Sequence, residues 1–400
     1  MSLASVAERL SSIDRSAVRL ETKRCLHSQD QFASCEACFA ICPASAIQSG
    51  KPPAFNSGLC VTCLACIQAC PADAYAGEDG IQAILTCVAR IETNQIELLC
   101  EKNPFGAQGC ASENIGVQVR GCLAGLGVGT LLALAALGAE HIVLRTDACA
   151  ECKWGRLQAV IDDHVTQTKA LLDKWGKSKI LESVSSLQST YVRPLWNAQN
   201  PPLSRRDLFR LAARQGQVAL ARSIEQTSPT SVHSPGRERR RIINAVEHLS
   251  ASKSEIDPIL AEGTYATVSV SDSCTACGIC ARTCPTGALH YLPDAGETTF
   301  QLTLSPQFCI GCELCAHICV PNAIVVNHTP LFSQIFEAKT DSLLRDGNLA
   351  HCEKCRAAYA GGPETHLCPA CSFRNKNPFG SRIPPGIKMP PRVLSERRSS

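Results

Sequence analysis

Aromatic residues are scarce in this chain of 400 residues: Phe, Trp and Tyr together make up 5% of it. This scarcity argues against a surface that stacks nucleic-acid bases. An excess of one charge is also lacking, because 39 basic and 36 acidic residues leave a formal net charge of +3. A balance this close to neutral gives no support to a nucleic-acid partner.

Several signatures of catalysis are missing as well. The sequence contains no nucleophilic triad, no phosphate-binding loop and no histidine-rich metal site. The glycine-rich stretch Gly125–Gly129 does not fit the dinucleotide fingerprint G-x-G-x-x-G, and no acidic residue follows at the expected distance. We therefore interpret this stretch as a tight turn.

Long apolar runs are rare too. The first 24 residues lack the continuous apolar core of a signal peptide. Between Arg120 and Glu140 lie nineteen residues without a charge, a length that just suffices to span a bilayer. Glycines at the start of this stretch and the strand-like HIVLRT after it favour a buried strand–turn–helix–strand unit. We expect a cytoplasmic protein without an integral membrane span.

Cysteine, in contrast, is abundant, with 26 residues, and most of them stand in closely spaced groups. Spacings of the C-x2-C type indicate metal ligands and not a disulfide framework. Free thiols of this kind persist in a reducing compartment, which agrees with the expected cytoplasmic location.

Residues 263–330 contain two long cysteine runs. The run Cys274–Pro285 has the spacing C-x2-C-x2-C-x3-C-P of bacterial [4Fe-4S] ferredoxins. In the second run the proline is shifted to Pro321 by an inserted Val. The segment resembles the bacterial two-[4Fe-4S] ferredoxin, in which the fourth cysteine of each run ligates the other cluster. The ligand sets are then Cys274, Cys277, Cys280 with Cys319, and Cys309, Cys312, Cys315 with Cys284.

The N-terminal part of the chain repeats this pattern with one departure. A complete run ends at Cys70-Pro71, but the run that ends at Cys42-Pro43 has Phe32 where its first cysteine belongs. Cys25 is the nearest substitute, and the alternative without it is a three-cysteine site of the [3Fe-4S] type. The exchange rule predicts the sets Cys25, Cys35, Cys38 with Cys70, and Cys60, Cys63, Cys66 with Cys42.

Residues 81–190 have a different pattern, in which apolar runs end at cysteines. We predict strands that end at Cys87, Cys100, Cys122 and Cys149, with helices over TLLALAALGA and GRLQAVIDDHVTQTKALLDKWG. Strands that alternate with helices predict a parallel sheet, whose carboxyl edge is the usual place for a ligand. Four thiolates gathered at that edge suit a further iron–sulfur cluster, and we predict Cys87, Cys122, Cys149 and Cys152 as its ligands.

The stretch VRGCLAGLGVGTLLALAALGAEHIVLRTDACAECKWG carries a second resemblance. It is similar to the iron–sulfur delta subunit of methyl-viologen-reducing hydrogenase and heterodisulfide reductase systems. The resemblance implies a [2Fe-2S] cluster and electron transfer between a hydrogenase or formate dehydrogenase and a flavoprotein. Where that family has paired cysteines at the first strand, this chain has only Cys87, whereas Cys100 and Cys110 are additional. The choice of four ligands among the six cysteines therefore stays open.

Two further C-x2-C pairs lie near the end of the chain, at Cys352, Cys355, Cys368 and Cys371. This spacing suits a tetrahedral site built from two knuckles, as in zinc ribbons. The second pair also resembles rubredoxin, which would make the metal iron. Zinc is favoured because no glycine follows either pair.

These patterns predict an α+β multidomain protein. Two ferredoxin-like two-cluster modules flank a central parallel α/β domain, and a zinc-ribbon-like knuckle follows. The predicted segments are a helix with the first module at 1–80, the α/β domain at 81–190, a helical and basic linker at 191–262, the second module at 263–330, and the knuckle with a disordered tail at 331–400.

A cluster held wholly by cysteine has no open coordination position, so it carries electrons and does not transform substrates. The first hypothesis is a non-catalytic polyferredoxin subunit that relays low-potential electrons between a dehydrogenase or hydrogenase and a flavin-, quinone- or disulfide-reducing partner, which includes flavoproteins and membrane reductases. The second is an accessory or maturation protein that delivers clusters or sulfur to a redox enzyme. The third is catalysis at an incompletely ligated site.

Overall fold

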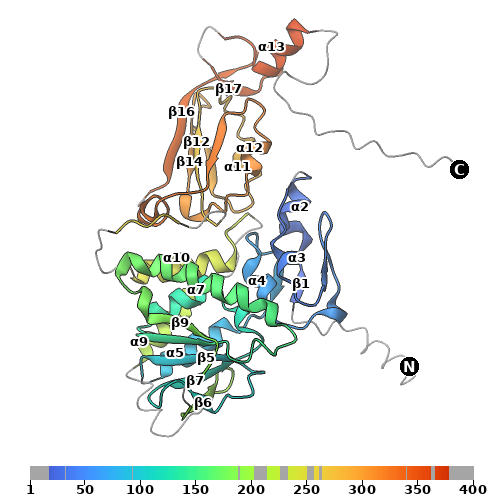
Figure 1. Ribbon diagram of the computed structural model, residues 1–400. Helices are drawn as coiled ribbons and strands as arrows, with labels where there is room; N and C mark the ends of the chain where they lie inside the picture. Colours follow the sequence, from blue (N-terminus) through green and yellow to red (C-terminus); the bar gives the residue numbers. More distant parts are fainter. Residues whose placement is uncertain are drawn as a thin grey trace, which may run out of the picture.

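The computed structural model describes residues 18–31, 33–91, 93–187, 190–201, 214–225, 233–249, 256–260, 264–338, 340–361 and 365–377. Within these residues the protein mixes helices with several small sheets and one larger parallel sheet (Figure 1). Most of the helix predicted at the start of the chain lies outside the described residues, as does the tail after Ser381. The described end of that segment, Val18–Leu20, is a strand and not a helix, because it pairs with a later strand.

The first cysteine module is built from short elements around its cysteine loops. Helices α3 (Ala37–Ile41) and α4 (Ala65–Ala69) end next to Cys42 and Cys70. A proline follows each of these cysteines, and the residue before a proline is disfavoured in helical conformation. The other elements are β1 (Val18–Leu20), η1 (Thr22–Arg24), α2 (Leu26–Gln29), β2 (Ile47–Gln48), β3 (Ala54–Phe55), η2 (Ser57–Leu59) and β4 (Tyr75–Gly77). Strands β1 and β4 pair antiparallel, and so do β2 and β3.

A five-stranded sheet with the order β11-β7-β5-β8-β9 forms the α/β domain, and every neighbouring pair in it is parallel. This confirms the predicted parallel sheet. Its strands are β5 (Gln95–Cys100), β7 (Ile115–Val119), β8 (His141–Arg145), β9 (Leu181–Val184) and β11 (Leu195–Asn197). A separate small sheet pairs β6 (Gln108–Gly109) with β10 (Tyr191–Val192).

The prediction of a strand that ends at Cys87 is wrong, because Ile81–Arg90 forms helix α5. The buried residues Ile81, Ile84, Leu85 and Val88 recur at helical spacing and face the core. Gly80 precedes the helix with a positive φ of 74°. Cys87 consequently lies on the buried face of a helix and not at the edge of the sheet.

The long uncharged stretch folds into the turn η3 (Leu123–Gly125) and helix α6 (Val128–Ala136), which is almost entirely buried. Gly138 follows α6 with a φ of 91°, the left-handed conformation that favours glycine after a helix. Among the described helices, none has both the length and the apolar character needed to cross a bilayer.

Two helices from the predicted linker pack onto the α/β domain. Helix α9 (Gln215–Glu225) packs against α5, and α10 (Arg237–Leu249) packs against α6. The arginine-rich start of α10 belongs to the predicted basic linker, but its Arg241 is buried against Asp79 and Glu225. The remaining helical elements here are η4 (Gly155–Leu157), α7 (Gln158–Leu172), η5 (Asp173–Trp175) and η6 (Ser178–Ile180).

The second cysteine module and the knuckle share one antiparallel sheet with the order β13-β14-β16-β17. Strands β12 and β15 form a separate antiparallel pair. The elements are β12 (Thr267–Val270), α11 (Ile279–Arg282), β13 (Leu289–Pro293), β14 (Thr299–Leu304), η7 (Pro306–Phe308), α12 (Leu314–His317), β15 (Ile324–Asn327), η8 (Ser333–Glu337), β16 (Ser342–His351), β17 (Ala358–Ala360) and α13 (Pro369–Lys376).

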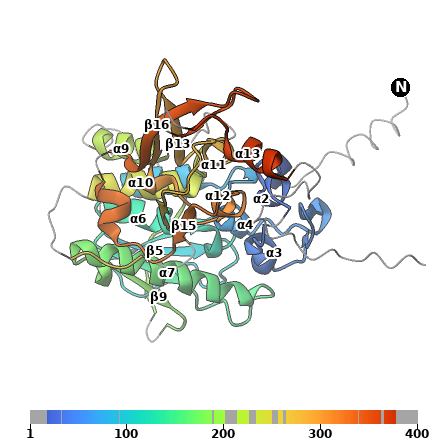
Figure 2. The same cartoon turned by 90° about the horizontal axis from the view of Figure 1, so that it is seen from above.

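The order of the parts in space differs from their order in the sequence. The α/β sheet lies at one end in Figure 1, helices α7 and α10 lie next to it, and the second module and knuckle form the other end. The first module lies at the side of the α/β domain. Viewed from above, the second module covers the α/β domain, while the first module stays to one side (Figure 2).

Candidate iron–sulfur and metal sites

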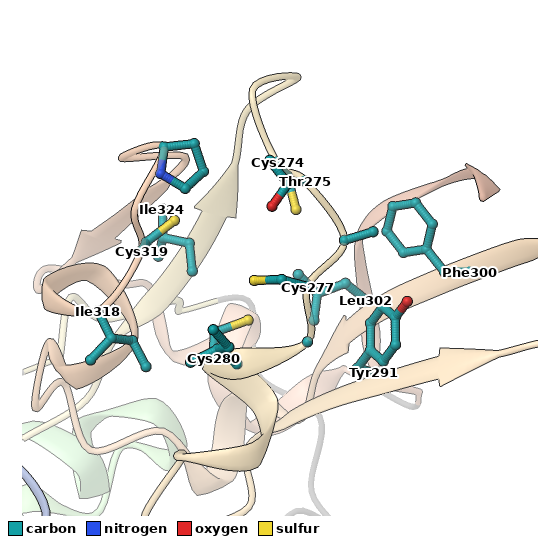
Figure 3. Close-up of a pocket in the computed structure, with 14 residues that line it drawn as sticks. Cys274, Thr275, Cys277, Cys280, Tyr291, Phe300, Leu302, Ile318, Cys319 and Ile324 are labelled. Atoms are coloured by element: carbon teal, nitrogen blue, oxygen red, sulfur yellow. The ribbon is translucent and has the colours of Figure 1, made fainter. Parts of the chain in front are cut away.

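The outer site of the second module consists of Cys274, Cys277, Cys280 and Cys319, which line one cavity (Figure 3). The loop before α11 curls around this cavity, with Ala276 and Gly278 at positive φ. Burial raises the pKa of Cys280 to about 12, and the neighbouring Cys277 and Cys274 thiolates add to the effect. The Tyr291 and Phe300 rings cover one side of the cavity.

The inner site of the second module gathers Cys284, Cys309, Cys312 and Cys315 around a second cavity. Burial raises the pKa of Cys312 to about 12, with further contributions from Cys284 and Cys309. The structure therefore groups the eight cysteines of this module as two sets of four, each with one cysteine from the other run. The two sets adjoin, because cysteines of both, including Cys280 and Cys315, pack against one hydrophobic cluster.

In the first module, Cys25 lies close to Cys35, Cys38 and Cys70. Burial raises the pKa of Cys38, and Cys35 and Cys25 add to it. Burial likewise raises the pKa of Cys70 to about 12, with contributions from Cys35 and Cys38. The chain reaches this position through η1 and α2, where Cys25 stands between the two helical turns.

The other site of the first module contains Cys42, Cys60, Cys63 and Cys66. Burial raises the pKa of Cys63, and the Cys42 and Cys60 thiolates raise it further. Burial also raises the pKa of Cys66, and the Cys63, Cys60 and Cys42 thiolates raise it further. This grouping again takes three cysteines from one run and the fourth from the other.

The α/β domain brings together a set that differs from the predicted one by a single residue. Cys100, Cys122, Cys149 and Cys152 line a cavity of about 330 Å³ at the carboxyl edge of the sheet. Burial raises the pKa of Cys122 to about 12, and Cys100 is the strongest of the neighbouring thiolates that add to it. Cys100 terminates the central strand β5.

Cys87 is not part of this set. Its side chain is fully buried in the hydrophobic core, and it does not line the cavity. Burial raises its pKa to about 12 without a contribution from another cysteine. In the sequence, the apolar run that ends at Cys100 and the one that ends at Cys87 look alike. The signal that separates them is the helical spacing of the apolar residues in 81–88.

A buried ion network supports the loops around the α/β site. Glu97, in the middle of β5, accepts hydrogen bonds from Arg145 Nη1 at 3.0 Å and from Arg193 Nη2 at 2.9 Å. All three side chains are fully buried. Arg145 also binds Asp147, two residues before Cys149, through Nε at 2.8 Å. The backbone N–H of Cys110 donates to Glu97 at 2.6 Å, which fixes the loop after Cys100.

The knuckle brings Cys352, Cys355, Cys368 and Cys371 together, with all four sulfur atoms within 4.8 Å of one another. Cys368 caps the N-terminus of α13, and its sulfur accepts a hydrogen bond from the backbone N–H of Cys371 at 3.4 Å. Four thiols at this spacing fit a tetrahedral metal site. The knuckle is joined to the second module, because the backbone N–H of Ala360 donates to the carbonyl of Thr275 at 3.0 Å.

The chemistry of these donor sets fits metal ions or clusters. Four thiolates gathered at one point repel one another unless a cation lies between them. An iron–sulfur cluster or a zinc ion supplies that positive charge, and thiolate sulfur is the donor that both prefer. No such argument applies to Cys87 or Cys110, neither of which lines one of these cavities.

Comparison with known proteins supports part of this assignment. The family model of the 4Fe-4S dicluster domain matches residues 273–323, which contain all eight cysteines of the second module. No curated protein and no solved structure matches the chain. The match and the cysteine runs together identify a ferredoxin-type iron–sulfur protein that binds [4Fe-4S] clusters and has the chemistry of electron transfer.

Proposed function

We propose that the chain is a relay subunit with five iron–sulfur sites in one row, which carries low-potential electrons between a dehydrogenase or hydrogenase and a flavin-, quinone- or disulfide-reducing partner. The sites are the four sets of the two ferredoxin modules and the Cys100, Cys122, Cys149, Cys152 set of the α/β domain. A bound cluster supplies a one-electron carrier. The protein's part is to hold successive sites next to each other, since the rate of electron tunnelling falls steeply with distance.

The contact between the α/β domain and the first module supports the first step of this row. Gly125 packs so closely on the first module that an added Cβ would lie 3.0 Å from the carbonyl oxygen of Cys63. The Cys63 thiolate also contributes to the raised pKa of Cys122, which burial causes in the first place. The site that contains Cys63 is therefore the neighbour of the α/β site.

The contact between the two modules supports the middle of the row, and it is the observation that carries the proposal. Leu26, Ala33, Ala72 and Ile310 form a small hydrophobic cluster, against which Cys35, Cys70 and Cys312 pack. His317 Nδ1 and Asp30 Oδ2 lie 3.3 Å apart at the same junction. Cysteines from sites of different modules thus share one apolar contact.

We name each site after one of its cysteines: the Cys63 site holds Cys42, Cys60, Cys63 and Cys66, the Cys35 site Cys25, Cys35, Cys38 and Cys70, the Cys312 site Cys284, Cys309, Cys312 and Cys315, and the Cys277 site Cys274, Cys277, Cys280 and Cys319. The row would run from the α/β site through the Cys63, Cys35 and Cys312 sites to the Cys277 site. Cys277 itself is exposed. We assign the knuckle, which adjoins this last site through Ala360 and Thr275, to structural zinc, because no glycine follows either of its cysteine pairs.

The first experiment is a metal and sulfide analysis of anaerobically purified protein, with electron paramagnetic resonance after dithionite reduction. Four [4Fe-4S] clusters and one [2Fe-2S] cluster predict about 18 iron atoms per chain beside one zinc. Interacting low-potential signals are expected from sites that adjoin. Clusters that stay oxidised beside a competent low-potential donor would contradict the relay. Irreversible transfer of clusters to an apo-enzyme would favour the maturation role instead.

A further inference from the structure

A buried arginine of helix α10 lies against the Cys312 site. Arg239 is 6% exposed, and its Nη2 donates a hydrogen bond to the backbone carbonyl oxygen of Cys309 at 3.3 Å. The same nitrogen donates to the carbonyl oxygen of Thr264, and the guanidinium carbon lies 4.2 Å from the centre of the Tyr265 ring. These contacts hold one positive charge next to a cysteine of this site.

This positive charge forms no ion pair with a carboxylate among the described residues. Glu238 precedes Arg239 in the sequence, but its Oε2 faces Arg241 Nη1 at 3.6 Å, and its Oε1 accepts a hydrogen bond from the backbone N–H of Gly129. An arginine keeps its charge in proteins, and a buried charge without a counter-charge is costly. The position of Arg239 therefore favours a negatively charged group close by.

A cluster bound at the Cys312 site is such a group. Four thiolates outweigh the positive charge of a [4Fe-4S] core, and reduction adds one more negative charge. Burial raises the pKa of Cys309, whereas the charge of Arg239 acts in the opposite direction, so the field of the guanidinium reaches this sulfur. A fixed cation at this position stabilises the more negative, reduced state of the site over the oxidised state.

We propose that Arg239 raises the reduction potential of the Cys312 site, so that an electron passing between the two modules is held there more strongly than cysteine ligation alone would hold it. The consequence for electron flow rests on the proposed relay, in which the Cys35 site is the neighbour. The Cys35 site loses the one electron that the Cys312 site gains, and no proton or further reactant takes part. Arg239 acts on this balance through its charge.

An exposed arginine at the other site of the same module provides a matched control. Arg282 Nη2 donates to the backbone carbonyl oxygen of Cys277 at 2.9 Å, which repeats the contact between Arg239 and Cys309. The Arg282 side chain is exposed, however, and salt screens an exposed charge far more than a buried one. Arg282→Gln should therefore shift the potential of the Cys277 site only slightly, and least of all at high salt.

The test is an anaerobic redox titration of the full-length, cluster-loaded protein at one fixed pH, followed by electron paramagnetic resonance. Arg239→Gln and Arg239→Met both remove the charge, and an apolar side chain of similar length is tolerated best at a buried position. We expect one [4Fe-4S] transition to move to lower potential. Its reduced-to-oxidised ratio at a given potential should fall about tenfold, which is 59 mV for one electron. Arg239→Lys keeps the charge and should retain most of the original potential.

Cys312→Ala identifies the transition, because it removes the cluster of this site. Iron content and circular dichroism verify that each Arg239 variant is loaded and folded. Three results would overturn the role of Arg239 while leaving the relay intact: unchanged potentials in a loaded neutral variant, a shift in Arg239→Lys as large as in Arg239→Met, or loss of iron from both neutral variants. If the clusters of the original protein cannot be reduced at all, the relay itself fails.

Discussion

Two cysteines of the α/β domain differ in what surrounds their sulfur atoms. Cys100 lines the cavity at the end of β5, whereas Cys87 lies on the buried face of α5, in the hydrophobic core. Cys100→Ala should therefore remove the cluster of this site and lower the iron content by about two atoms per chain. Cys87→Ala should keep all iron and cost about 1 kcal/mol of stability. Iron analysis and visible spectra distinguish the two, and the opposite pattern would restore Cys87 as the ligand.

Glu97 is a fully buried carboxylate that two arginines share. Glu97→Ala would leave both guanidinium groups buried without their partner, and breaking a buried ion pair costs about 3–5 kcal/mol. The exposed pair His141–Glu182 is the control, because an exposed pair contributes about 0–1 kcal/mol. Chemical unfolding of Glu97→Ala and Glu182→Ala measures both, and equal losses would show that the buried network contributes little.

The same carboxylate predicts a dependence of stability on pH. Burial raises the pKa of Glu97, but the hydrogen bonds from Arg193 and Asn114 outweigh it, so the net pKa is lowered. A lowered pKa stabilises the fold above the unfolded-state value of about 4.3, and the contribution is lost as the pH falls through the folded-state pKa. The stability difference between the original protein and Glu97→Ala should therefore persist at pH 5–7 and shrink only below about 4.3.

At the scale of single elements, the turn η3 joins the α/β domain to the first module. Gly125→Val would push this turn against Cys63, because even a Cβ would lie 3.0 Å from its carbonyl oxygen. We expect unchanged iron content but weaker magnetic interaction between the two neighbouring clusters. Gly216→Val is the control, since nothing lies within 4 Å of a Cβ added there. Unchanged interaction in the Gly125 variant would contradict the proposed neighbourhood.

The knuckle around α13 offers a separate test of metal identity. Cys368→Ser removes one of its four thiols, so we expect loss of the zinc with the iron content unchanged. Cys110→Ser is the matched control, because Cys110 lines none of the cysteine cavities described above. Metal analysis of both variants is sufficient. Loss of one iron atom in place of zinc would make the knuckle a rubredoxin-like iron site.

At the scale of the whole molecule, the Cys35 site occupies the middle of the proposed row. Cys35→Ala should remove about four iron atoms and abolish the magnetic interaction between the first and second modules. The interaction between the α/β site and the Cys63 site should remain. Electron paramagnetic resonance of the reduced variant measures both. If the interaction with the second module survives, the row has a different order.

Local spacing made several features of this protein predictable. The cysteine runs indicated the cluster type, because a cubane needs thiolates at short, fixed separations. The alternation of strands and helices predicted the parallel sheet. Cys87 shows where this reasoning failed: a short apolar run fits both a buried strand and a buried helix, and the choice depends on which face packs against the core.

The sequence by itself determined the chemistry of this protein: cysteines that act as metal ligands, two ferredoxin-like patterns and a four-cysteine knuckle. The tertiary structure alone decided which sites adjoin. Cys35, Cys70 and Cys312 meet at one apolar contact although some 240 residues separate Cys70 from Cys312. Such a contact depends on how whole modules pack, and no local spacing encodes it.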